Sequence, residues 1–497
     1  PDEDTAVQHI GNVSSHLPQL DHKPARPRRC CDGAMSDAIL HAGFGHPRAN
    51  ASLPMTGAGN VDVPGLVRVF VCCAALYLAI YALEAPVRYG LYLAGKDNLI
   101  LLRDGLMAGP LLLLCAAQAA QLRLHPAFAA FGLAIGFHGL VLMGTIGSVM
   151  GVVYGVKILL NLLFGFFVAG ILLGERPGMR RLFWLLWCLI MIGILLDKAG
   201  MAFPWTGMRT MVGDLNVDVS KDWQISDPFA RRVAGFTRSS IAVAAILPCL
   251  TIVLMSRMRG LWPRLALAVP SIVGVFLTTQ KGSLIAFVPV ALLLCLPSLI
   301  RLTWLRLCFL GFLLLAAGLP LFTHGLHLDH GDGVFSMESL YLRIAYTWPD
   351  AWDWIARNQM LVFGVGLGGI GGPQRLYASS AFNPADNIAV LLFAWFGLFA
   401  VLYAALTVHL ALRPVTGDRR RAEAAVAILA FAAGYGVVLS VIEDQAACLF
   451  LGAAIGTLWR ETSPVAPSAP KPMETSDEWE FTDRPPPGRR HPGPVRI

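Results

Sequence analysis

The chain has 497 residues, of which 56% are hydrophobic and only 14% are charged. The apolar residues form long blocks, a composition that excludes an ordinary soluble domain. The net charge of +7 also fails to indicate a nucleic-acid partner, because the basic residues cluster in short connections beside apolar blocks, without RNP, zinc-finger or helix-turn-helix patterns. We therefore predict an all-α polytopic membrane protein whose surroundings are the lipid bilayer.

The two ends of the chain differ from the middle in composition. Residues 1–62 are polar, rich in Pro, His and Arg, and without the apolar core of a signal peptide, so we expect a disordered cytoplasmic region in which Met35 and Met55 are candidate initiators. Residues 461–497 are Pro-rich and charged, and we expect a disordered cytoplasmic tail. The membrane domain is thereby predicted over residues 63–460.

Apolar segments of spanning length follow one another through this domain. A spanning helix needs about 20 mostly apolar residues, and roughly twelve segments qualify. They lie near 64–84, 98–120, 126–144, 149–173, 181–199, 239–256, 263–279, 283–300, 304–323, 387–410, 422–441 and 445–459.

The connections between these segments carry unequal charge. With the N-terminus in the cytoplasm, the even-numbered connections are short and basic, as in "GERPGMRR" and "SRMRGLWPR". The odd-numbered connections hold most of the loop acids and include two long loops, 200–238 and 324–386. This asymmetry predicts that both termini are cytoplasmic. Since loops of this length are usually functional, we expect the functional residues on the outer side.

The second long loop contains the stretch "SMESLYLRIAYTWPDAWDWIARN", whose apolar residues recur at roughly helical spacing. This pattern predicts a helix along the membrane interface. Trp348, Trp352 and Trp354 would serve there as interfacial anchors or as stacking surfaces for sugars. The preceding stretch "HGLHLDHGDG" (324–333) leaves a divalent metal site open as an alternative, although we expect none.

Ionisable residues also lie inside the apolar segments, where they are costly and often functional. All of them map to the outer halves of the predicted helices. Two interpretations stay open: a substrate site, or structural pairs of Arg103 or Lys157 with Asp104 or Asp197. The residues are Glu84, Arg103, Asp104, Lys157, Asp197 and Lys198.

A group of outer cations runs against the usual charge distribution of membrane proteins. Arg231, Arg232 and Arg238 lie in the first long loop, Lys281 lies in a very short outward turn, and Arg343 lies in the second long loop. We predict that they surround an outward cavity for an anion, since Arg suits the bidentate geometry of phosphate oxygens. Ordinary lipid headgroup contacts remain the alternative, and a lipid-linked pyrophosphate is the anion that fits best.

Three stretches of the sequence resemble motifs that occur together in one protein superfamily. "RRVAGFTRSSIAVAAIL" is similar to an Arg-x-x-Gly-Phe element that enters a helix, and "FLTTQKGSLIAFVPV" resembles a Thr-x-Ser-Arg-Gly turn with Gln280 and Lys281 in place of Ser-Arg. "YLRIAYTWPDAWDWIARNQMLVFGVGLGG" resembles a run of Arg, then Trp, then alternating glycines that include Gly366. Together they resemble the bacterial O-antigen ligase and Wzy-type polysaccharide polymerase superfamily, and the arrangement is most similar to exopolysaccharide polymerases of the xanthan type.

The resemblance implies a GT-C-like glycosyltransferase of the bacterial inner membrane that polymerises undecaprenyl-pyrophosphate-linked oligosaccharides at the periplasmic face. It implies inverting transfer without a metal or cofactor, and partners among the flippase and the chain-length or export proteins of the same pathway. Arg232 and Arg343 would be catalytic. Asp386 stands where the superfamily has a His before Asn387, so Asp386 is the first candidate base, with His330 and Asp350 next and helix capping as its structural alternative.

Other classes of function were weighed against this one. The glycine run also matches G-x-G-x-x-G, but it lacks the preceding strand of a dinucleotide site, and tight turning near a ligand explains the glycines better. A ligase that uses the same donor but another acceptor remains an alternative. A transporter or flippase is the alternative from a different class, although the chain lacks two matching halves.

Overall fold

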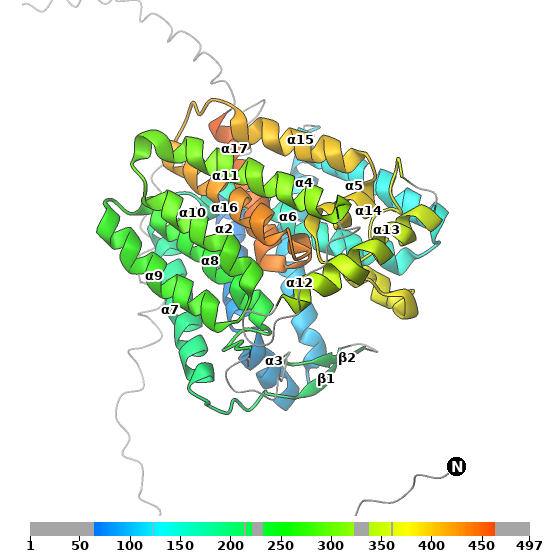
Figure 1. The fold of residues 1–497 in the computed structure, drawn as a ribbon, viewed down its shortest axis with the longest axis horizontal. Helices are drawn as coiled ribbons and strands as arrows, with labels where there is room; N and C mark the ends of the chain where they lie inside the picture. The colour runs from blue at the N-terminus through cyan, green and yellow to red at the C-terminus, as the bar shows by residue number, and fades with distance from the viewer. Residues whose placement is uncertain are drawn as a thin grey trace, which may run out of the picture. The chain divides into compact units, whose positions relative to one another are not determined.

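The computed structural model describes residues 64–122, 124–212, 215–220, 232–322, 337–358 and 361–462. Within these ranges the regular secondary structure is helical except for one short hairpin (Figure 1). The α-helices are α2 (Pro64–Ala82), α3 (Glu84–Leu93), α4 (Leu102–Ala120), α5 (Pro126–Thr145), α6 (Val149–Leu172), α7 (Pro177–Lys198), α8 (Ser240–Arg257), α9 (Leu261–Leu277), α10 (Lys281–Cys295), α11 (Ser298–Gly318), α12 (Glu338–Leu342), α13 (Trp348–Arg357), α14 (Ile388–Phe396), α15 (Phe399–Leu412), α16 (Arg419–Tyr435) and α17 (Gln445–Glu461).

Every apolar segment predicted to span the membrane overlaps with at least one helix. Seven spans are long and apolar enough to cross a bilayer: Gly65–Ala82, Asp97–Ala120, Pro126–Thr145, Val149–Leu172, Pro177–Lys198, Ser240–Arg257 and Ser298–Leu321. The other predicted segments correspond to helices of 17 residues or fewer. The expectation of a helical, multi-pass membrane protein is thus supported by seven spans. The predicted tails, 1–62 and 461–497, lie outside the described residues, apart from the end of α17 and Thr462.

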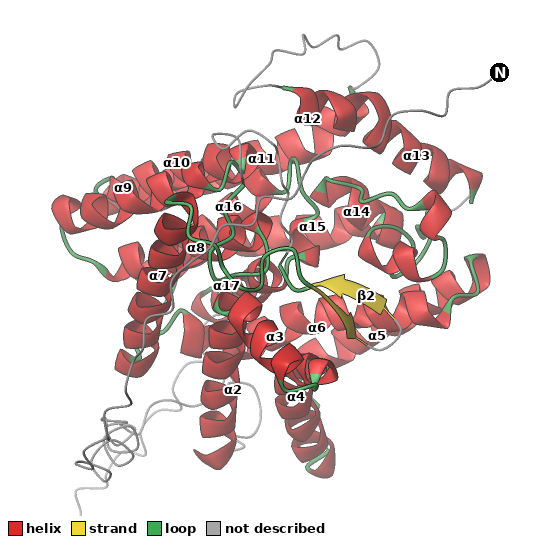
Figure 2. Ribbon diagram, turned by 90° about the horizontal axis from the view of Figure 1, so that it is seen from below, coloured by secondary structure: helices red, strands yellow, loops and turns green. Residues whose placement is uncertain are grey.

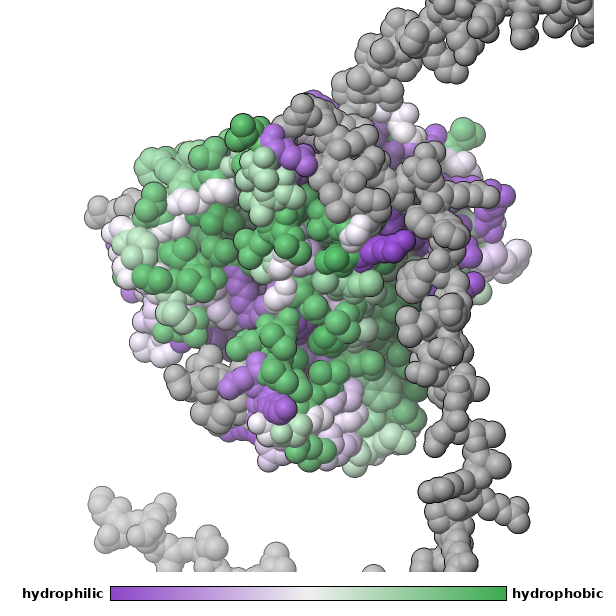
Figure 3. Space-filling view, turned by 180° about the vertical axis from the view of Figure 1, so that it is seen from behind, coloured by the Kyte–Doolittle hydropathy of each residue, from purple (hydrophilic) through white to green (hydrophobic). Residues whose placement is uncertain are grey.

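The outer surface of the helices is apolar. Leu133 and Leu140 on α5 are both 74% exposed, and Leu314 on α11 is 73% exposed. Figure 3 shows a face on which hydrophobic side chains cover a broad continuous area. Large exposed apolar areas are unfavourable in water but favourable against lipid tails, so this surface is suited to a bilayer.

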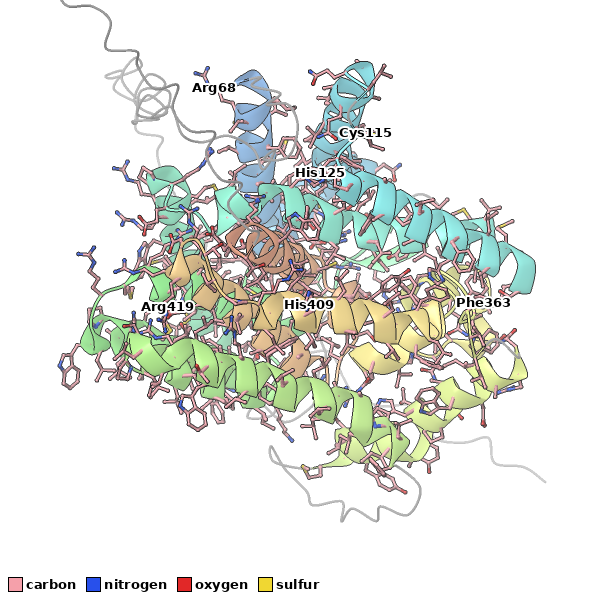
Figure 4. All side chains as sticks on the ribbon, turned by 90° about the horizontal axis from the view of Figure 1, so that it is seen from above. Arg68, Cys115, His125, Phe363, His409 and Arg419 are labelled. Atoms are coloured by element: carbon pink, nitrogen blue, oxygen red, sulfur yellow. The ribbon has the colours of Figure 1, made fainter. Side chains whose placement is uncertain are left out.

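The interior is built around α8 and α16, whose residues are almost all buried. Helix α17 packs closely along α6, where a Cβ at Gly452 would collide with the backbone of Leu162. Small residues at such crossings let two helix backbones approach, as in membrane helix pairs. Helices α2 and α4 project side by side, with Arg68 and Cys115 near their free ends, while α5, α11 and α15 lie across them (Figures 2 and 4).

The tenth predicted span, 387–410, is not one helix. It breaks at Gly397, whose φ of +58° places it in the left-handed region that favours glycine. The glycine run packs against the break: the Val365 N–H donates to the Ala394 carbonyl at 2.7 Å, and the Leu398 N–H donates to the Val362 carbonyl at 2.9 Å. The prediction of a single helix was wrong because these hydrogen bonds replace the helical ones.

A β-hairpin interrupts the first long loop, and the sequence did not predict it. Strand β1 (Arg209–Val212) pairs antiparallel with β2 (Leu215–Asp218), drawn in yellow in Figure 2. Beside it, Phe203 and Trp205 stack at 4.8 Å and pack with Phe236. This aromatic cluster fixes the end of the loop that leads to α8.

The second long loop contains the expected helical segment, formed by α12, a π-helical turn (Arg343–Thr347) and α13. Its tryptophans pack on protein. Trp348 is fully buried. Trp352 stands against Phe393 at 5.4 Å, and Trp354 donates a hydrogen bond to the Gly369 carbonyl at 3.0 Å. The buried Trp348 therefore anchors the start of α13 to the protein interior.

Candidate functional site

Charged residues of α3, of the start of α4 and of α6 form one ion-pair network. Arg103 Nη1 lies 2.8 Å from Glu84 Oε2, and Arg88 Nη2 lies 2.7 Å from Glu84 Oε1. Lys157 Nζ lies 2.8 Å from Asp104 Oδ2. Burial alone would raise the pKa of Glu84, but Arg103 and Arg88 lower it to about 2. The predicted pairing of Arg103 and Lys157 with Asp104 is thus present.

Asp197, at the end of α7, holds the chain that precedes α8. Its Oδ2 accepts hydrogen bonds from the backbone N–H groups of Ala234 at 2.8 Å and Gly235 at 2.9 Å. These bonds fix the turn between Arg232 and Arg238. Arg238 reaches the Glu84 network, since Glu84 opposes the lowering of the Arg238 pKa that burial causes.

A second polar group lies beside the first, and we call it the Asp386 group: Arg232, Lys281, Arg343 and Asp386. Arg343 Nη2 forms an ion pair with Asp386 Oδ2 at 3.2 Å. Burial and the nearby Arg343 lower the pKa of Arg232, and Lys281 lies within electrostatic reach of Arg232. The structure thus brings together three of the cations that the sequence predicted to surround one cavity, and a fourth segment adds the carboxylate of Asp386.

The backbone at Asp386 is unusual. Ala385 and Asp386 adopt φ values of +60° and +44°, a left-handed conformation that non-glycine residues rarely take and that is often found at functional sites. Ser440 Oγ donates to the Pro384 carbonyl at 3.0 Å, and Asn383 Nδ2 donates to the Thr347 carbonyl at 2.8 Å. Burial raises the pKa of Asp386, although Arg343 opposes the rise. Its carboxyl is therefore a stronger base than an exposed aspartate.

Asn387, and not Asp386, caps the helix that follows. Asn387 caps α14 by accepting hydrogen bonds from the N–H groups of Ala389 and Val390, at 2.8 and 3.0 Å. Its Nδ2 donates to the carbonyls of Ala316 and Val437. Because Asn387 is fully buried and uses its amide in this way, it positions the Asp386 loop rather than meeting a ligand.

A cavity of about 240 Å³ opens next to these groups. It is lined by Tyr154, Lys157, Ile158, Asn161, Gly372, Arg375, Phe382, Pro384, Glu443 and Gln445. Its walls combine aromatic rings with amide and charged groups, a mixture that suits a polar organic ligand such as a sugar.

Glu443, between α16 and α17, lines this cavity, and the sequence analysis did not single it out. Its Oε1 accepts a hydrogen bond from the Gly372 N–H at 2.6 Å. Burial raises the pKa of Glu443 to about 7, with Asp386 adding to the rise, while the Gly372 hydrogen bond and Arg375 oppose it. A usable signal was the pair of adjacent acids in "VIEDQA", in a short break between apolar blocks.

Asp444 connects the cavity to the first described helix. Its Oδ2 accepts a hydrogen bond from the Tyr81 hydroxyl at 2.6 Å, and its Oδ1 caps α17 through the Ala447 N–H. On the neighbouring side, the Tyr77 hydroxyl donates to Asn161 Oδ1 at 2.6 Å. Helices α2, α6 and α17 are thereby joined around the cavity wall.

The remaining predicted site residues are dispersed. Gly366 has a φ of +105° and packs against the backbone of Leu142. Asp350 is exposed on α13. Arg231, His330 and the stretch 324–333 lie outside the described residues. In the ranges that the structure covers, no group of three or more His, Cys, Asp or Glu side chains is arranged to hold a metal ion.

Comparison of the chain with models of protein families, with curated proteins and with solved structures gives no match. The interpretation of the site therefore depends on its own geometry and on the sequence motifs.

Proposed function

We propose that the chain is an inner-membrane glycosyltransferase that polymerises undecaprenyl-pyrophosphate-linked oligosaccharide repeat units into exopolysaccharide at the periplasmic face. The observation that supports this most is the Asp386 group, in which Arg343 pairs with the Asp386 carboxylate, Arg232 lies within electrostatic reach of Arg343, and Lys281 lies within electrostatic reach of Arg232. Three cations in a partly buried place suit a pyrophosphate, and a carboxylate in the same group suits a base. The resemblance of the surrounding motifs to the Wzy-type superfamily points to the same reaction.

In the proposed reaction, the hydroxyl oxygen of the acceptor repeat attacks the anomeric carbon of the donor glycan. The bond from that carbon to the pyrophosphate oxygen breaks, and the lipid pyrophosphate leaves with the electron pair. Arg232 and Lys281 would stabilise the charge that grows on the phosphate oxygens. Asp386 would accept the proton of the attacking hydroxyl. Attack opposite to the leaving group inverts the configuration at the anomeric carbon.

Arg343 has a second role in this proposal. Its ion pair with Asp386 holds the carboxylate in place and keeps a larger fraction of it ionised than burial alone would allow. The strained backbone at Ala385 and Asp386 would present the carboxylate to the acceptor.

The function can be tested in a strain that lacks this protein but still makes the lipid-linked repeat. The strain is complemented with wild type, Arg232→Ala or Asp386→Asn, and the glycan on undecaprenyl pyrophosphate is sized by mass spectrometry. Arg357→Ala and Asp350→Asn, at exposed positions of α13, are matched controls. Asp350→Asn also tests one of the two other candidate bases.

We expect single repeats to accumulate with Arg232→Ala and Asp386→Asn, and long chains to return with wild type and both controls. Loss of the base should lower the transfer rate about 10²- to 10⁴-fold. Long chains that remain on the lipid carrier in the deletion strain would indicate a ligase. Repeats trapped on the cytoplasmic side would indicate a transporter, and normal chain length in the deletion strain would reject the proposal.

A further inference from the structure

The ends of α7 and α8 that lie away from the Asp386 group border a second cavity, of about 390 Å³. Five arginines line it, together with one acid and one proline: Arg176, Arg180, Arg257, Arg259, Arg420, Glu175 and Pro177. Arg420 follows Arg419, which Figure 4 labels at the start of α16. Five guanidinium groups against a single carboxylate give the cavity a strong positive potential.

The position of this cavity relative to a bilayer follows from the spans that meet there. The span Val149–Leu172 ends at the cavity, Pro177–Lys198 begins there, and Ser240–Arg257 ends there. The opposite end of α8 follows Arg232 and Arg238 directly, so the 18 residues of α8 separate the two sites by about 27 Å. The cavity therefore lies where apolar spans end, at the depth of lipid headgroups.

Protein groups satisfy only part of the hydrogen-bonding capacity of Arg257, which lines the cavity. Its Nη2 donates to the carbonyls of Leu172 at 2.8 Å and Gly174 at 2.6 Å. Its Nε and Nη1 are buried and have no hydrogen-bond partner among the described residues. Buried donors without partners are unfavourable, so a ligand with acceptor oxygens would be stabilised there.

The tendency of membrane proteins to place basic residues on one side explains a surplus of arginine in short connections. It does not require that arginines from three separate connections converge on one cavity. Within the described ranges, none of the five arginines forms an ion pair with an acidic side chain. The charge is thus available to an external anion.

We propose that this cavity binds the phosphate group of an anionic membrane lipid. Guanidinium groups bind phosphate oxygens through paired hydrogen bonds, and basic pockets between membrane helices are suited to such headgroups. A zwitterionic lipid would be less favourable, because its own cation would face five arginines. The proposal does not depend on the glycosyltransferase function.

The test uses the purified full chain in detergent and native mass spectrometry, with added phosphatidylglycerol or phosphatidylcholine. The variants are Arg180→Gln and the triple variant Arg180→Gln/Arg259→Gln/Arg420→Gln, all at exposed positions. Arg181→Gln is the matched control, because Arg181 is the next residue of α7, is exposed and does not line the cavity. A thermal melt of each variant confirms that it is folded.

We expect wild type and Arg181→Gln to retain one phosphatidylglycerol in preference to phosphatidylcholine. Affinity should fall about fivefold for each arginine removed, as for arginines near an anionic lipid surface. Displacement of the lipid by a few mM inorganic phosphate would support the phosphate site but assign it to a soluble phosphate compound. Equal retention of both lipids, or equal affinity of wild type and a folded triple variant, would overturn the proposal. If the triple variant does not fold, Arg180→Gln against Arg181→Gln decides.

Discussion

Two partly buried carboxyl groups near the cavity, Asp386 and Glu443, illustrate how a partner sets the behaviour of a side chain. Burial raises the pKa of both. Asp386 has the guanidinium of Arg343 as its partner, whereas Glu443 accepts a hydrogen bond from the Gly372 N–H. The pKa of Glu443 is therefore about 7. Its charge state should influence both the stability of the fold and the charge of the cavity.

Glu443→Gln should stabilise the protein at high pH only. A carboxyl whose folded pKa is raised contributes full stability below its unfolded pKa of about 4.3, and that stability is lost as the pH rises to about 7. Glutamine cannot ionise and can still accept the Gly372 hydrogen bond. We expect a gain on the order of 3 kcal/mol at pH 8 and almost none at pH 4.5. Thermal melts in detergent measure it.

The control for this prediction is Glu338→Gln at an exposed position of α12, which should show no comparable difference between the two pH values. A gain of equal size at pH 4.5 and pH 8 for Glu443→Gln would show that the stabilisation does not come from the ionisation of Glu443.

Replacing Arg343 should move the pH dependence of the proposed transfer. Arg343 lowers the pKa of Asp386 against the rise that burial causes, so Arg343→Gln should raise that pKa further. Because the base must be ionised, activity is lost as the pH falls through this pKa, and the acid limb should move to higher pH. Transfer rates between pH 5 and 8 measure it, and Arg343→Lys should largely restore the original profile. An unchanged acid limb would exclude Asp386 as the titrating base.

At the scale of elements, the main feature is the glycine run that packs into the break between α14 and α15. On one side, the run donates a backbone hydrogen bond to the Ala394 carbonyl and accepts one from the Leu398 N–H; on the other, the Leu367 N–H donates to the His138 carbonyl. A peptide segment that bonds to helix ends in this way needs very close approach of backbones. A Cβ added at Gly366 or Gly368 would collide with the backbone of α5 or α6.

Gly366→Ala should destabilise the fold strongly. Gly366 has a φ of +105°, and a Cβ would collide with the backbone of Leu142 in α5. Gly147→Ala is the matched control, because Gly147 also has a positive φ, of +74°, but has open space around its Cβ position. We expect about 1 kcal/mol for the control from backbone strain alone, and several times as much for Gly366→Ala. Equal melting temperatures for the two variants would contradict the role of close packing.

For the whole molecule, the proposed orientation places the Asp386 group and the arginine cavity on opposite sides of the membrane. Asp350→Cys and Arg181→Cys, at exposed positions near the two sites, report on this in a background without Cys30, Cys31, Cys72 and Cys188. A membrane-impermeant maleimide should label Asp350→Cys in intact spheroplasts and Arg181→Cys only after permeabilisation. Labelling of both from the same side would contradict the orientation.

The sequence predicted the helices well because a bilayer demands long apolar blocks, and such blocks are visible without any tertiary information. It also predicted that Arg232, Lys281 and Arg343 would gather, because outer cations need a common anion. It did not predict the cavity at Glu443, since that depends on a loop, 371–384, folding onto the break between α16 and α17. The sequence also did not predict the break at Gly397, because the break depends on a tertiary contact with a segment more than 30 residues earlier.

The hydrogen bond between Tyr81 and Asp444 has a consequence for biosynthesis. Helix α2 leaves the ribosome when more than 360 residues of chain have still to be made before its partner appears. Until then the Tyr81 hydroxyl lacks its acceptor, and the cavity lacks the wall that Glu443 and Gln445 supply. A product that stops before α17 would enter the membrane with its early helices in place and its cavity open, so completion of synthesis and completion of the site coincide.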